Sequence, residues 1–348
     1  MRAVLMGAHG DLSNLSVGEI TAPTLQNDRQ VLVRLKAAAL NHLDLWTLAG
    51  LPGISIKFPH ILGGDGAGVV EQVGSAVTTV KIGDPVLINP GIPCYHCEYC
   101  LAGEQSLCLD YRILGEHLPG TLAELVVVPE PNVARFPRPA TEGEIPWAQA
   151  AAVSLVTLTA WRMLVSRAKL RPGEVVLIWG IGGGVSLAAL QIARLIGAFT
   201  IVTSGSDEKL ARARAMGADA TLNHASTDVA KEVRKITDRR GADVVVDNVG
   251  EATWEHSLRA LGRGGRLVTC GGTSGPSLHT DVRKLFWYQW TIMGSTMGNH
   301  AEYAEIVRLF GRGELQPVID STVPLERAAE GLRRMQEGKQ FGKIVVNI

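Results

Sequence analysis

The sequence predicts an α/β protein with two domains, one rich in short β-strands and one built on a doubly wound parallel sheet. The chain has 348 residues, more than a single hydrophobic core usually organises. Its first part contains short apolar runs broken by glycine and proline, which is typical of a β-rich domain. Its second part alternates buried strands with amphipathic helices, which is typical of a parallel sheet covered on both faces.

The β-rich domain is predicted to comprise residues 1–147 and 290–348. Its strands are expected in QVLVRLKAAAL, GAGVVEQVG, DPVLINP and AELVVVP. The proline-rich segment Pro129–Trp147 indicates a connection between the domains. The C-terminal segment GKIVVNI resembles the strands of the first part, so we expect it to return to the first domain.

The second domain is predicted to comprise residues 148–289. Its strands are expected in VVLIWG, FTIVTS, ADATLN, ADVVVDNVG and GRLVTCGG. Helices are expected between them, for example in VSLAALQIARLIG and DEKLARARAMG. Because the strands are continuously apolar, the sheet should be buried on both faces.

Composition excludes several classes of partner. Lysine and arginine together number 34, as do aspartate and glutamate, so the formal net charge is zero. Such a chain has no net field that attracts nucleic acid or an anionic membrane. No window reaches the ~18 apolar residues of a membrane span, and the N-terminus lacks the pattern of a secretion signal. We therefore expect a cytoplasmic protein that acts on a small molecule and binds neither nucleic acid nor membrane.

A glycine-rich turn lies directly between a predicted strand and a predicted helix in VVLIWGIGGGVSLAALQIARLIG. Gly180, Gly182 and Gly183 would let backbone N–H groups approach a pyrophosphate at the positive end of the helix dipole. A second strand follows about 20 residues later, which strengthens the prediction of a dinucleotide site. Ser186 stands where the last glycine of this fingerprint would be, so we expect a slightly looser approach of helix and strand there.

The second strand of this unit predicts which dinucleotide binds. An NAD-preferring site would carry an acidic residue near Ser204, to accept a hydrogen bond from the ribose 2′-hydroxyl. This chain has Ser204, Gly205 and Ser206 there, with Lys209 downstream. The missing carboxylate and the nearby lysine favour a 2′-phosphate, and hence NADP(H) over NAD(H). Asp207 comes too late in the strand end and is expected to cap the following helix.

Four of the five cysteines fall in one short stretch. Cys94, Cys97, Cys100 and Cys108 have the spacing C-x2-C-x2-C-x7-C, which suits tetrahedral Zn²⁺ bound by four thiolates. In a reducing cytosol such cysteines favour metal over disulfides. A closed site of this kind leaves no position for water or substrate, so one structural zinc per chain is expected. An iron–sulfur cluster could use the same ligands. Cys270 is expected to be a buried core residue.

These features together resemble the medium-chain zinc-type alcohol dehydrogenase and quinone oxidoreductase superfamily. The likeness runs from QVLVRLKAAALNHLDLW through GGDGAGVVEQVG, the cysteine lobe and IWGIGGGVSLAALQIARLIGA to GKIVVNI. The resemblance implies a GroES-like catalytic domain, an inserted Rossmann domain and a cleft between them. It also implies assembly as a homodimer or homotetramer, with the aromatic run Phe286–Trp290 in core and subunit packing.

The same resemblance raises the question of a second, catalytic zinc. In the alcohol dehydrogenase branch its ligands are a cysteine, a histidine followed by glutamate, and a cysteine or aspartate. These positions fall here on Asn41, on Gly64 with Asp65, and on Leu155, and the hydroxyl that relays the proton falls on Leu43. Glycine and leucine cannot ligate through side chains, and asparagine is a poor zinc ligand. A rearranged site using His42 and Asp44 with Asp65 is an alternative.

Without a Lewis acid, alcohol oxidation is disfavoured because no metal stabilises the alkoxide. An enone, enoyl thioester or quinone delocalises the arriving charge onto an oxygen that needs only hydrogen-bond donors. We therefore expect an NAD(P)H-dependent oxidoreductase that transfers hydride to such an acceptor. An apolar pocket is expected around Trp46, Leu155 and Met297. The alternatives are an alcohol dehydrogenase with an unusual metal set and a non-enzymatic nucleotide-binding protein.

The resemblance also suggests roles for single residues. Asn41 would donate to the substrate oxygen or to the nicotinamide ribose, with His42 and Asp44 beside it as further catalytic residues. The alternatives are that Asp44 caps a helix, that Asp65 is structural and that His42 has no chemical role.

On the cofactor side, Thr159 would pack beside the nicotinamide, and Gly250 would let the chain pass close to the cofactor. Lys343 would either approach the phosphates or pair with Asp65.

Overall fold

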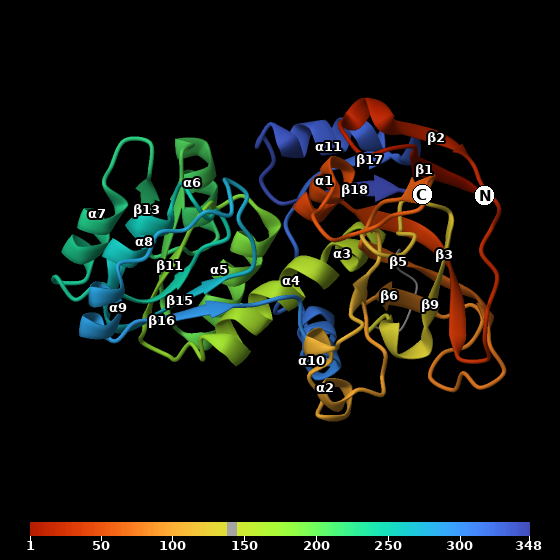
Figure 1. Cartoon of the computed structure of the whole chain (residues 1–348), viewed down its shortest axis with the longest axis horizontal. Helices are drawn as coiled ribbons and strands as arrows, with labels where there is room; N and C mark the ends of the chain where they lie inside the picture. The colour runs from red at the N-terminus through yellow and green to blue at the C-terminus, as the bar shows by residue number, and fades with distance from the viewer. Residues whose placement is uncertain (138–144) are drawn as a thin grey trace. The chain divides into compact units, whose positions relative to one another are not determined.

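The computed structural model describes residues 1–137 and 145–348 and divides them into two compact units (Figure 1). Unit 1 contains residues 1–158 and 298–348, and unit 2 contains residues 159–297. The prediction of an α/β protein with a β-rich domain and a parallel-sheet domain is confirmed. The division falls somewhat later than the predicted boundaries at 147 and 289, because Trp147–Ala152 forms a helix that packs on the sheet of unit 1. Three buried alanines, Ala150–Ala152, allow this close approach.

The larger sheet of unit 1 follows the order β10-β6-β5-β3-β18-β17, with β9 also paired to β3. The last strand of the chain, β18, pairs antiparallel with β3, so the predicted return of GKIVVNI to the first domain is confirmed. The strands of this sheet are β3 (Gln30–Ala39), β5 (Asp65–Val73), β6 (Pro85–Ile88), β9 (Leu125–Pro129), β10 (Val133–Arg135), β17 (Ile319–Pro324) and β18 (Lys343–Asn347).

Smaller strands and helices complete unit 1. The strands β1 (Arg2–Met6), β2 (Leu15–Glu19) and β4 (His60–Ile61) form a second sheet, and β7 (Gly91–Ile92) pairs with β8 (Arg112–Ile113). The helices are α1 (His42–Ala49), α2 (Glu98–Leu101), α3 (Trp147–Ala152), α4 (Ser154–Trp161), which contains the boundary, α10 (His300–Gly311) and α11 (Ala328–Gln336). Single turns of 3₁₀-helix occur at Leu12–Asn14, Gln105–Leu107, Glu130–Asn132 and Leu325–Arg327.

The predicted connection Pro129–Trp147 is wrong at its start. Val133–Arg135 forms β10 and pairs antiparallel with β6, with Val133 buried and Arg135 exposed. A chain that continues the sheet in this way belongs to the first domain. Residues 138–144 of the predicted connection lie outside the described residues.

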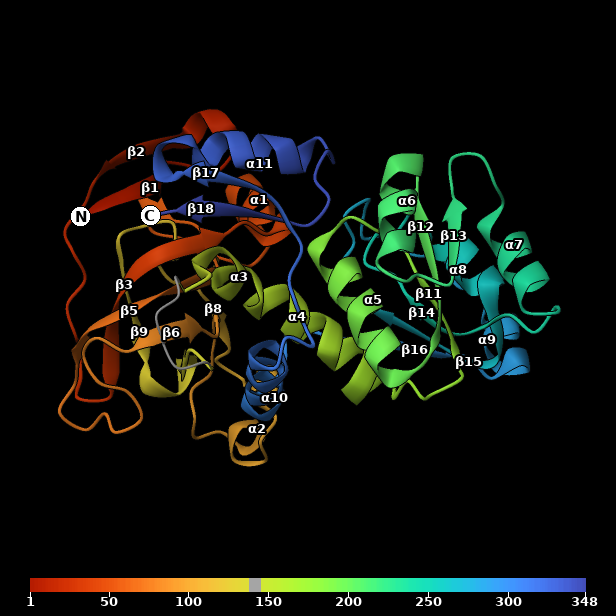
Figure 2. The same ribbon diagram turned by 180° about the vertical axis from the view of Figure 1, so that it is seen from behind.

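Unit 2 contains one six-stranded parallel sheet in the order β13-β12-β11-β14-β15-β16. All four residues of β11 are buried, which requires cover on both faces of the sheet. In Figure 2, α5 and α6 lie in front of these strands. The strands are β11 (Val175–Ile178), β12 (Phe199–Ser204), β13 (Ala220–Asn223), β14 (Ala242–Val246), β15 (Leu261–Thr269) and β16 (Thr291–Gly294). The helices are α5 (Gly184–Ile196), α6 (Asp207–Ala215), α7 (Val229–Ile236), α8 (Trp254–Ala260) and α9 (Val282–Tyr288), and Arg162–Arg167 is a π-helix.

The order of strands predicts where a ligand binds in unit 2. Counted along the chain, the strands lie in the order 3-2-1-4-5-6, so the direction of winding reverses between β11 and β14. Ligands of such sheets bind outside the carboxyl ends of the strands at this reversal. The glycine turn follows β11 and the segment Asp247–Gly250 follows β14, so both lie at this position.

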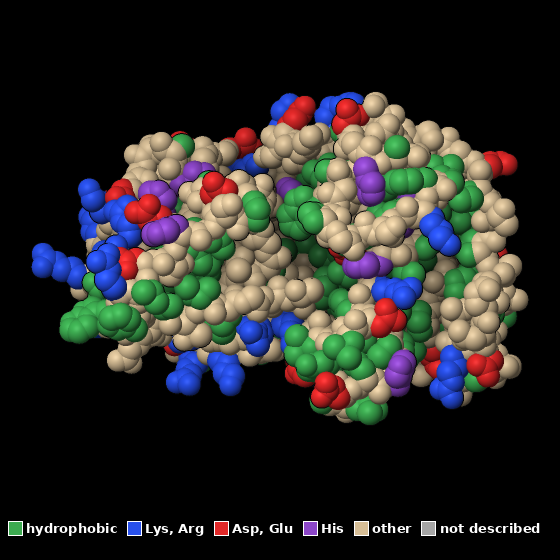
Figure 3. Space-filling model, in the orientation of Figure 1, with side chains coloured by type: hydrophobic (Ala, Val, Ile, Leu, Met, Phe, Trp, Pro, Cys, Tyr) green, Lys and Arg blue, Asp and Glu red, His purple; other side chains and the backbone are tan. Residues whose placement is uncertain are grey.

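The surface of unit 2 exposes an unusual apolar area on α9. The exposed fractions of Val282, Phe286 and Trp287 are 64%, 66% and 64%. These three side chains account for the hydrophobic area over α9 at the lower left of Figure 3. The neighbouring strand β16 is the last of the sheet and has no strand partner on its outer side among the described residues. Among the helices of residues 1–137 and 145–348, none has the length and apolar composition of a membrane span.

Candidate active site, nucleotide site and metal centre

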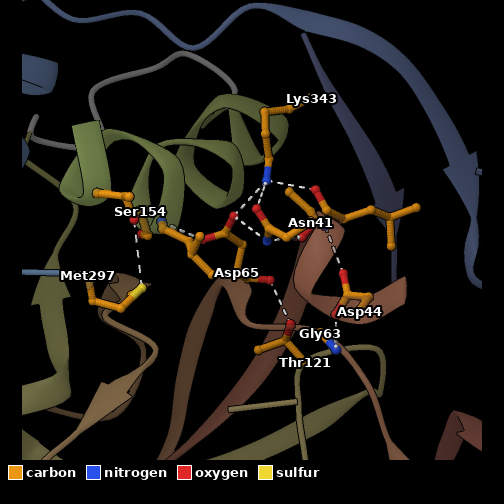
Figure 4. A network of polar contacts seen from close by, with 12 residues as sticks. Asn41, Asp44, Gly63, Asp65, Thr121, Ser154, Met297 and Lys343 are labelled. Carbon is orange, nitrogen blue, oxygen red and sulfur yellow. Dashed lines mark hydrogen bonds and ion pairs between the residues drawn. The ribbon is translucent and has the colours of Figure 1, made fainter. Parts of the chain in front are cut away.

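A buried ammonium group lies at the centre of the candidate active site in unit 1 (Figure 4). The Nζ atom of Lys343 donates to Oδ2 of Asp65 at 2.9 Å, to Oδ1 of Asn41 at 2.5 Å and to the carbonyl oxygen of Leu40 at 2.7 Å. Lys343 is 4% exposed and Asp65 is fully buried. An ammonium has three protons to donate, so these three acceptors satisfy it.

Asn41 and Asp65 are held by further contacts. The Nδ2 atom of Asn41 donates to Asp65 Oδ2 at 3.0 Å and to the carbonyl oxygen of Ala39 at 3.2 Å. Oδ1 of Asp65 accepts from the backbone N–H of Leu155 at 2.7 Å. The hydroxyl of Thr121 donates to the carbonyl oxygen of Asp65 at 2.6 Å. The amide of Asn41 is therefore engaged on both of its ends within the protein.

Asp44 closes the N-terminus of α1. Its Oδ2 accepts from the backbone N–H of Asn41 at 2.7 Å, and its Oδ1 accepts from the N–H of Gly63 at 2.9 Å. Burial raises the pKa of Asp44 to about 6, although the two backbone hydrogen bonds and the charge of Lys343 oppose this shift. Of the two roles predicted for Asp44, the contacts therefore favour the helix cap, which also ties α1 to the chain before β5.

His42 is the predicted catalytic residue whose side chain is least constrained. It is half-buried and lies near Trp46, with ring centroids 6.5 Å apart. Burial lowers its pKa, and the positive charge of Lys343 lowers it further. The imidazole is consequently neutral at pH 7 and keeps one N–H that can donate a hydrogen bond.

The positions that resemble zinc ligands do come together in unit 1. A Cβ atom placed on Gly64 would lie 3.1 Å from Cδ1 of Leu155. Leu155 in turn contacts Asp65 through its backbone, and Asp65 contacts Asn41. Of the two roles predicted for Lys343, the pairing with Asp65 is the one observed.

The sequence did not reveal two residues of this network. Thr121 lies 56 residues from Asp65, and Leu40 contributes only a backbone carbonyl. No motif marks either of them. Such contacts depend on how distant strands are brought together, which local sequence patterns do not encode.

In unit 2 the glycine turn has the geometry of a phosphate-binding loop. Gly180 and Gly182 have φ angles of +67° and +119°, which side chains other than glycine rarely adopt. Gly183 is the N-cap of the 13-residue helix α5. A Cβ atom on Gly183 would have no neighbour closer than 3.7 Å, so this helix end has room for an anion. The residues present therefore fit a dinucleotide pyrophosphate.

Ser186 lies on the protein side of this turn. It is fully buried, and its hydroxyl donates to the carbonyl oxygen of Trp179 at 2.8 Å. The hydroxyl fastens α5 to the end of β11, because a serine can bond back to a carbonyl where a glycine could not.

Ser204 lies at the end of β12 and carries no carboxylate. Ser204 Oγ accepts from the N–H of Ser206 at 3.1 Å. The prediction that Asp207 caps α6 is wrong. Ser206 is the N-cap and accepts from the N–H of Lys209 at 3.4 Å, whereas Asp207 accepts from Nδ2 of Asn223 at 2.7 Å. Asn223 ends the neighbouring strand β13, so the carboxylate of Asp207 makes a tertiary contact while Ser206 caps the helix.

Thr159 and Gly250 lie at the remaining predicted cofactor positions. The hydroxyl of Thr159 lies 3.8 Å from Sδ of Met297. Gly250 has a φ angle of +89°, and a Cβ atom there would lie 2.7 Å from the carbonyl oxygen of Gly275. The close approach that requires glycine at 250 is therefore made by the loop after β15.

The four cysteines form a metal centre in unit 1. Their Sγ atoms all lie within 4.8 Å of one another, and no other such group of ligands occurs in residues 1–137 and 145–348. Backbone N–H groups donate to two of the sulfurs, from Cys97 to Cys94 at 3.3 Å and from Cys94 to Cys108 at 3.2 Å. These contacts and distances fit four thiolates around one Zn²⁺. His96 bonds the carbonyl oxygen of Cys94 at 2.7 Å and is not a ligand. Cys270 lies outside the cluster.

Comparison with known proteins agrees with this combination of sites. Residues 27–138 match the family model described as alcohol dehydrogenase GroES-like domain, and residues 184–312 match that of zinc-binding dehydrogenase. An NAD-dependent alcohol dehydrogenase of Saccharolobus solfataricus is 32% identical, over 99% of both chains. An acryloyl-coenzyme A reductase of Sulfurisphaera tokodaii is 30% identical, over 99% of both chains.

Solved structures give the same result. A crystal structure of an NAD-dependent alcohol dehydrogenase covers 100% of both chains with 46% identity and a TM-score of 0.95. The relatives therefore share the two domains as well as the sequence. The chain belongs to the zinc-type alcohol dehydrogenase superfamily, with GroES-like and Rossmann domains, and is an NAD(P)-dependent oxidoreductase.

Proposed function

We propose that this oxidoreductase transfers hydride from NAD(P)H to an activated acceptor, such as an enoyl thioester, an enone or a quinone, without a catalytic zinc. The observation that carries the proposal is the network around Lys343. At the three positions that resemble zinc ligands, the chain has Asn41, whose amide bonds Lys343 and Asp65, Gly64, which has no side chain, and Leu155, whose side chain is apolar. None of these side chains is a good ligand for a divalent cation.

The chemistry of reduction fits these residues. A bound NAD(P)H would supply the hydride, and an enone or enoyl thioester that accepts it would gather negative charge on its carbonyl oxygen. We propose that the neutral imidazole of His42 donates a hydrogen bond to this oxygen, because its N–H is not committed to another described residue. Water from the solvent would supply the proton to the α-carbon and leave as hydroxide, which would complete the reduction of the carbon–carbon double bond.

Two relatives support a reductive role. The acryloyl-coenzyme A reductases of Sulfurisphaera tokodaii and Metallosphaera sedula are each 30% identical to this chain over 99% of its length. The name of these two enzymes describes the reduction of an enoyl thioester. The half-buried ring of Trp46 and the buried side chain of Leu155 would suit an apolar acceptor.

The proposal is tested by combining turnover with metal analysis. We expect oxidation of reduced dinucleotide with acryloyl-coenzyme A or another member of an enoyl thioester, enone and quinone panel, little oxidation of ethanol, and one zinc per chain. The variants His42→Leu and His42→Gln form a matched pair, because only glutamine keeps an N–H donor. We expect kcat to fall about 100-fold or more in His42→Leu and much less in His42→Gln.

A second candidate is an alcohol dehydrogenase with an unusual metal set, because His42, Asp44 and Asp65 lie in one region of unit 1 and several relatives are named alcohol dehydrogenases. The carboxylate oxygens of Asp44 and Asp65 already accept hydrogen bonds, which a metal would have to replace. Robust alcohol oxidation together with two zinc ions per chain would favour this candidate over the first.

We further propose that NADP(H) is preferred over NAD(H). The support is the absence of a carboxylate at the end of β12, where Ser204 stands, and the presence of Lys209 in the first turn of α6. Several relatives are named NAD-dependent, so a direct comparison of NADPH and NADH in binding and turnover is the test.

We also propose that the protein assembles as a homo-oligomer, either dimer or tetramer. The support is the combination of the exposed apolar face of α9 with the adjoining edge strand β16. An unpaired edge strand beside exposed aromatic side chains is a surface on which a second copy can continue the sheet.

A further inference from the structure

Two loops lie at the carboxyl ends of β11 and β14, where the order of the strands in the sheet reverses direction. The glycine turn Gly180–Gly183 follows β11, and Asp247–Gly250 follows β14. A Cβ atom on Gly180 would lie 3.7 Å from Cγ2 of Val249, so the loops are neighbours. In a sheet of this order, β11 opens the first mononucleotide-binding half and β14 opens the second. The loop after β14 therefore belongs to the nicotinamide half of the dinucleotide site.

The carboxylate of Asp247 holds this second loop from the inside. It is fully buried. Its Oδ1 accepts from the N–H groups of Val249 and Gly250, each at 3.0 Å, and from the hydroxyl of Thr253 at 2.9 Å. Its Oδ2 accepts from the hydroxyls of Thr253 at 2.9 Å and Ser257 at 2.6 Å.

No lysine, arginine or histidine pairs with Asp247 among the described residues. Neutral donors alone satisfy this charge, and a buried carboxylate is tolerated only where its hydrogen-bonding capacity is filled. The carboxylate bonds two successive N–H groups, those of Val249 and Gly250, and so fixes the direction of the backbone between them. Hydrogen bonds to a charged acceptor are stronger than those between neutral groups, which makes this restraint firm.

A second set of contacts holds the same loop from the outside. Ser274 donates to the carbonyl oxygen of Val249 through its hydroxyl at 2.7 Å and its N–H at 2.8 Å. The hydroxyl of Ser274 accepts from the N–H of Ala252 at 3.0 Å. The close approach of Gly250 to Gly275 completes this contact. The loop is therefore fixed on both sides before any ligand binds.

Between these contacts lies one polar atom that the protein leaves unsatisfied. Oδ1 of Asn248 is buried and has no hydrogen-bond partner. Buried acceptors of this kind usually have a partner. A nicotinamide nucleotide offers suitable donors in its carboxamide group and ribose hydroxyls. Oδ1 of Asn248, next to Asp247 in the chain, is thus an acceptor to which a ligand on this loop would donate.

We propose that Asp247 is a positioning residue for the nicotinamide half of the dinucleotide. It acts through the backbone of Val249 and Gly250 and through the acceptor that Asn248 presents, with the hydroxyls of Thr253 and Ser257 as its supports. Asp247 itself contacts neither cofactor nor substrate in this role. The inference holds whichever acceptor is reduced, and it is independent of the preference for NADP(H).

The test separates the two halves of the site by using two ligands. Reduced dinucleotide occupies both halves, whereas ADP occupies only the half at the glycine turn. In Asp247→Asn, one N–H or hydroxyl donor loses its acceptor, so we expect the Kd of NAD(P)H to rise about tenfold or more. The Kd of ADP should stay within about twofold of wild type.

A matched pair at Thr253 keeps the test informative if Asp247→Asn does not fold. Thr253→Val has nearly the same shape as threonine but lacks the hydroxyl, whereas Thr253→Ser keeps the hydroxyl. We expect weaker NAD(P)H binding in Thr253→Val and nearly normal binding in Thr253→Ser, with zinc content unchanged in both. Equal weakening of NAD(P)H and ADP, or no weakening of either, would overturn the proposal.

Discussion

The ammonium of Lys343 and the carboxylate of Asp65 form an ion pair with a length of 2.9 Å, although 278 residues separate them in the chain. Both side chains are buried. Asn41 bonds both partners, and the backbone of Leu155 bonds the remaining carboxylate oxygen. The ammonium of Lys343 thus lies beside Asn41 and Asp65, at positions that resemble the metal site of the alcohol dehydrogenase branch.

The first prediction concerns the stability of this pair. Lys343→Met leaves the buried carboxylate of Asp65 without its cation, so we expect a loss of about 3–5 kcal/mol in the free energy of unfolding. Arg327→Met breaks the exposed pair with Glu330 and should change stability little. Thermal and urea unfolding of the two variants measure the difference. Similar behaviour of both variants would contradict a special role for the buried pair.

The second prediction concerns pH. Asp44 has a pKa of about 6 in the folded protein against an ordinary value of 3.8, because it is buried. Between these values the folded protein keeps a proton that the unfolded chain has released. The contribution of Asp44 to stability is therefore greatest below pH 4 and falls as the pH rises to about 6.

Measurements of Tm from pH 4 to pH 7 test this dependence. Glu116, whose pKa burial also raises to about 6, acts in the same window. We expect the decline of Tm with rising pH to become shallower in Asp44→Asn and in Glu116→Gln, and shallowest in the double variant. An unchanged slope in the double variant would argue against these shifts.

The third prediction concerns the metal centre. Cys94→Ser removes one of four thiolates, so we expect the loss of most of the bound zinc and a lower Tm. Cys270→Ser, at a cysteine outside the cluster, should keep one zinc per chain. Elemental analysis after dialysis against a chelator distinguishes the two variants. Retention of the full zinc content by Cys94→Ser would show that this thiolate is not a ligand.

The fourth prediction concerns the dinucleotide. Ser204→Asp places a carboxylate at the end of β12, where it can accept from a ribose 2′-hydroxyl and repel a 2′-phosphate. We expect the ratio of kcat/KM for NADPH to that for NADH to fall about tenfold or more. Ser204→Asn, which adds a similar volume without charge, should shift this ratio much less. If both variants shift the ratio equally, charge at this position does not select the cofactor.

The fifth prediction concerns assembly. Phe286→Glu places a charge in the exposed apolar face of α9, so we expect a smaller oligomer in solution. Leu195→Glu adds the same charge at an exposed apolar residue of α5 and should leave assembly unchanged. Analytical ultracentrifugation compares the two with wild type. An unaltered mass in Phe286→Glu and Trp287→Glu would place the interface elsewhere.

The fold and the metal centre could be predicted from the sequence because their signals are local. Continuous apolar runs predict the strands of unit 2, glycines with positive φ mark the turn after β11, and four cysteines within 15 residues suffice for a zinc site. The missing carboxylate at Ser204 is also a local feature. Each of these depends on residues that are neighbours in the chain.

The tertiary structure alone decided how the predicted catalytic residues are used. Asn41 is predicted to donate to the substrate oxygen or the nicotinamide ribose, and Asp44 either to act beside it or to cap a helix; in the structure their polar atoms bond Lys343, Asp65 and the backbone of Gly63. Asp247 was not among the predicted site residues, and its partners include Ser257 on the following helix α8. The chemical role of a side chain depends on which groups form hydrogen bonds with it. Here those groups come from strands far apart in the chain, so only the packing of the strands determines them.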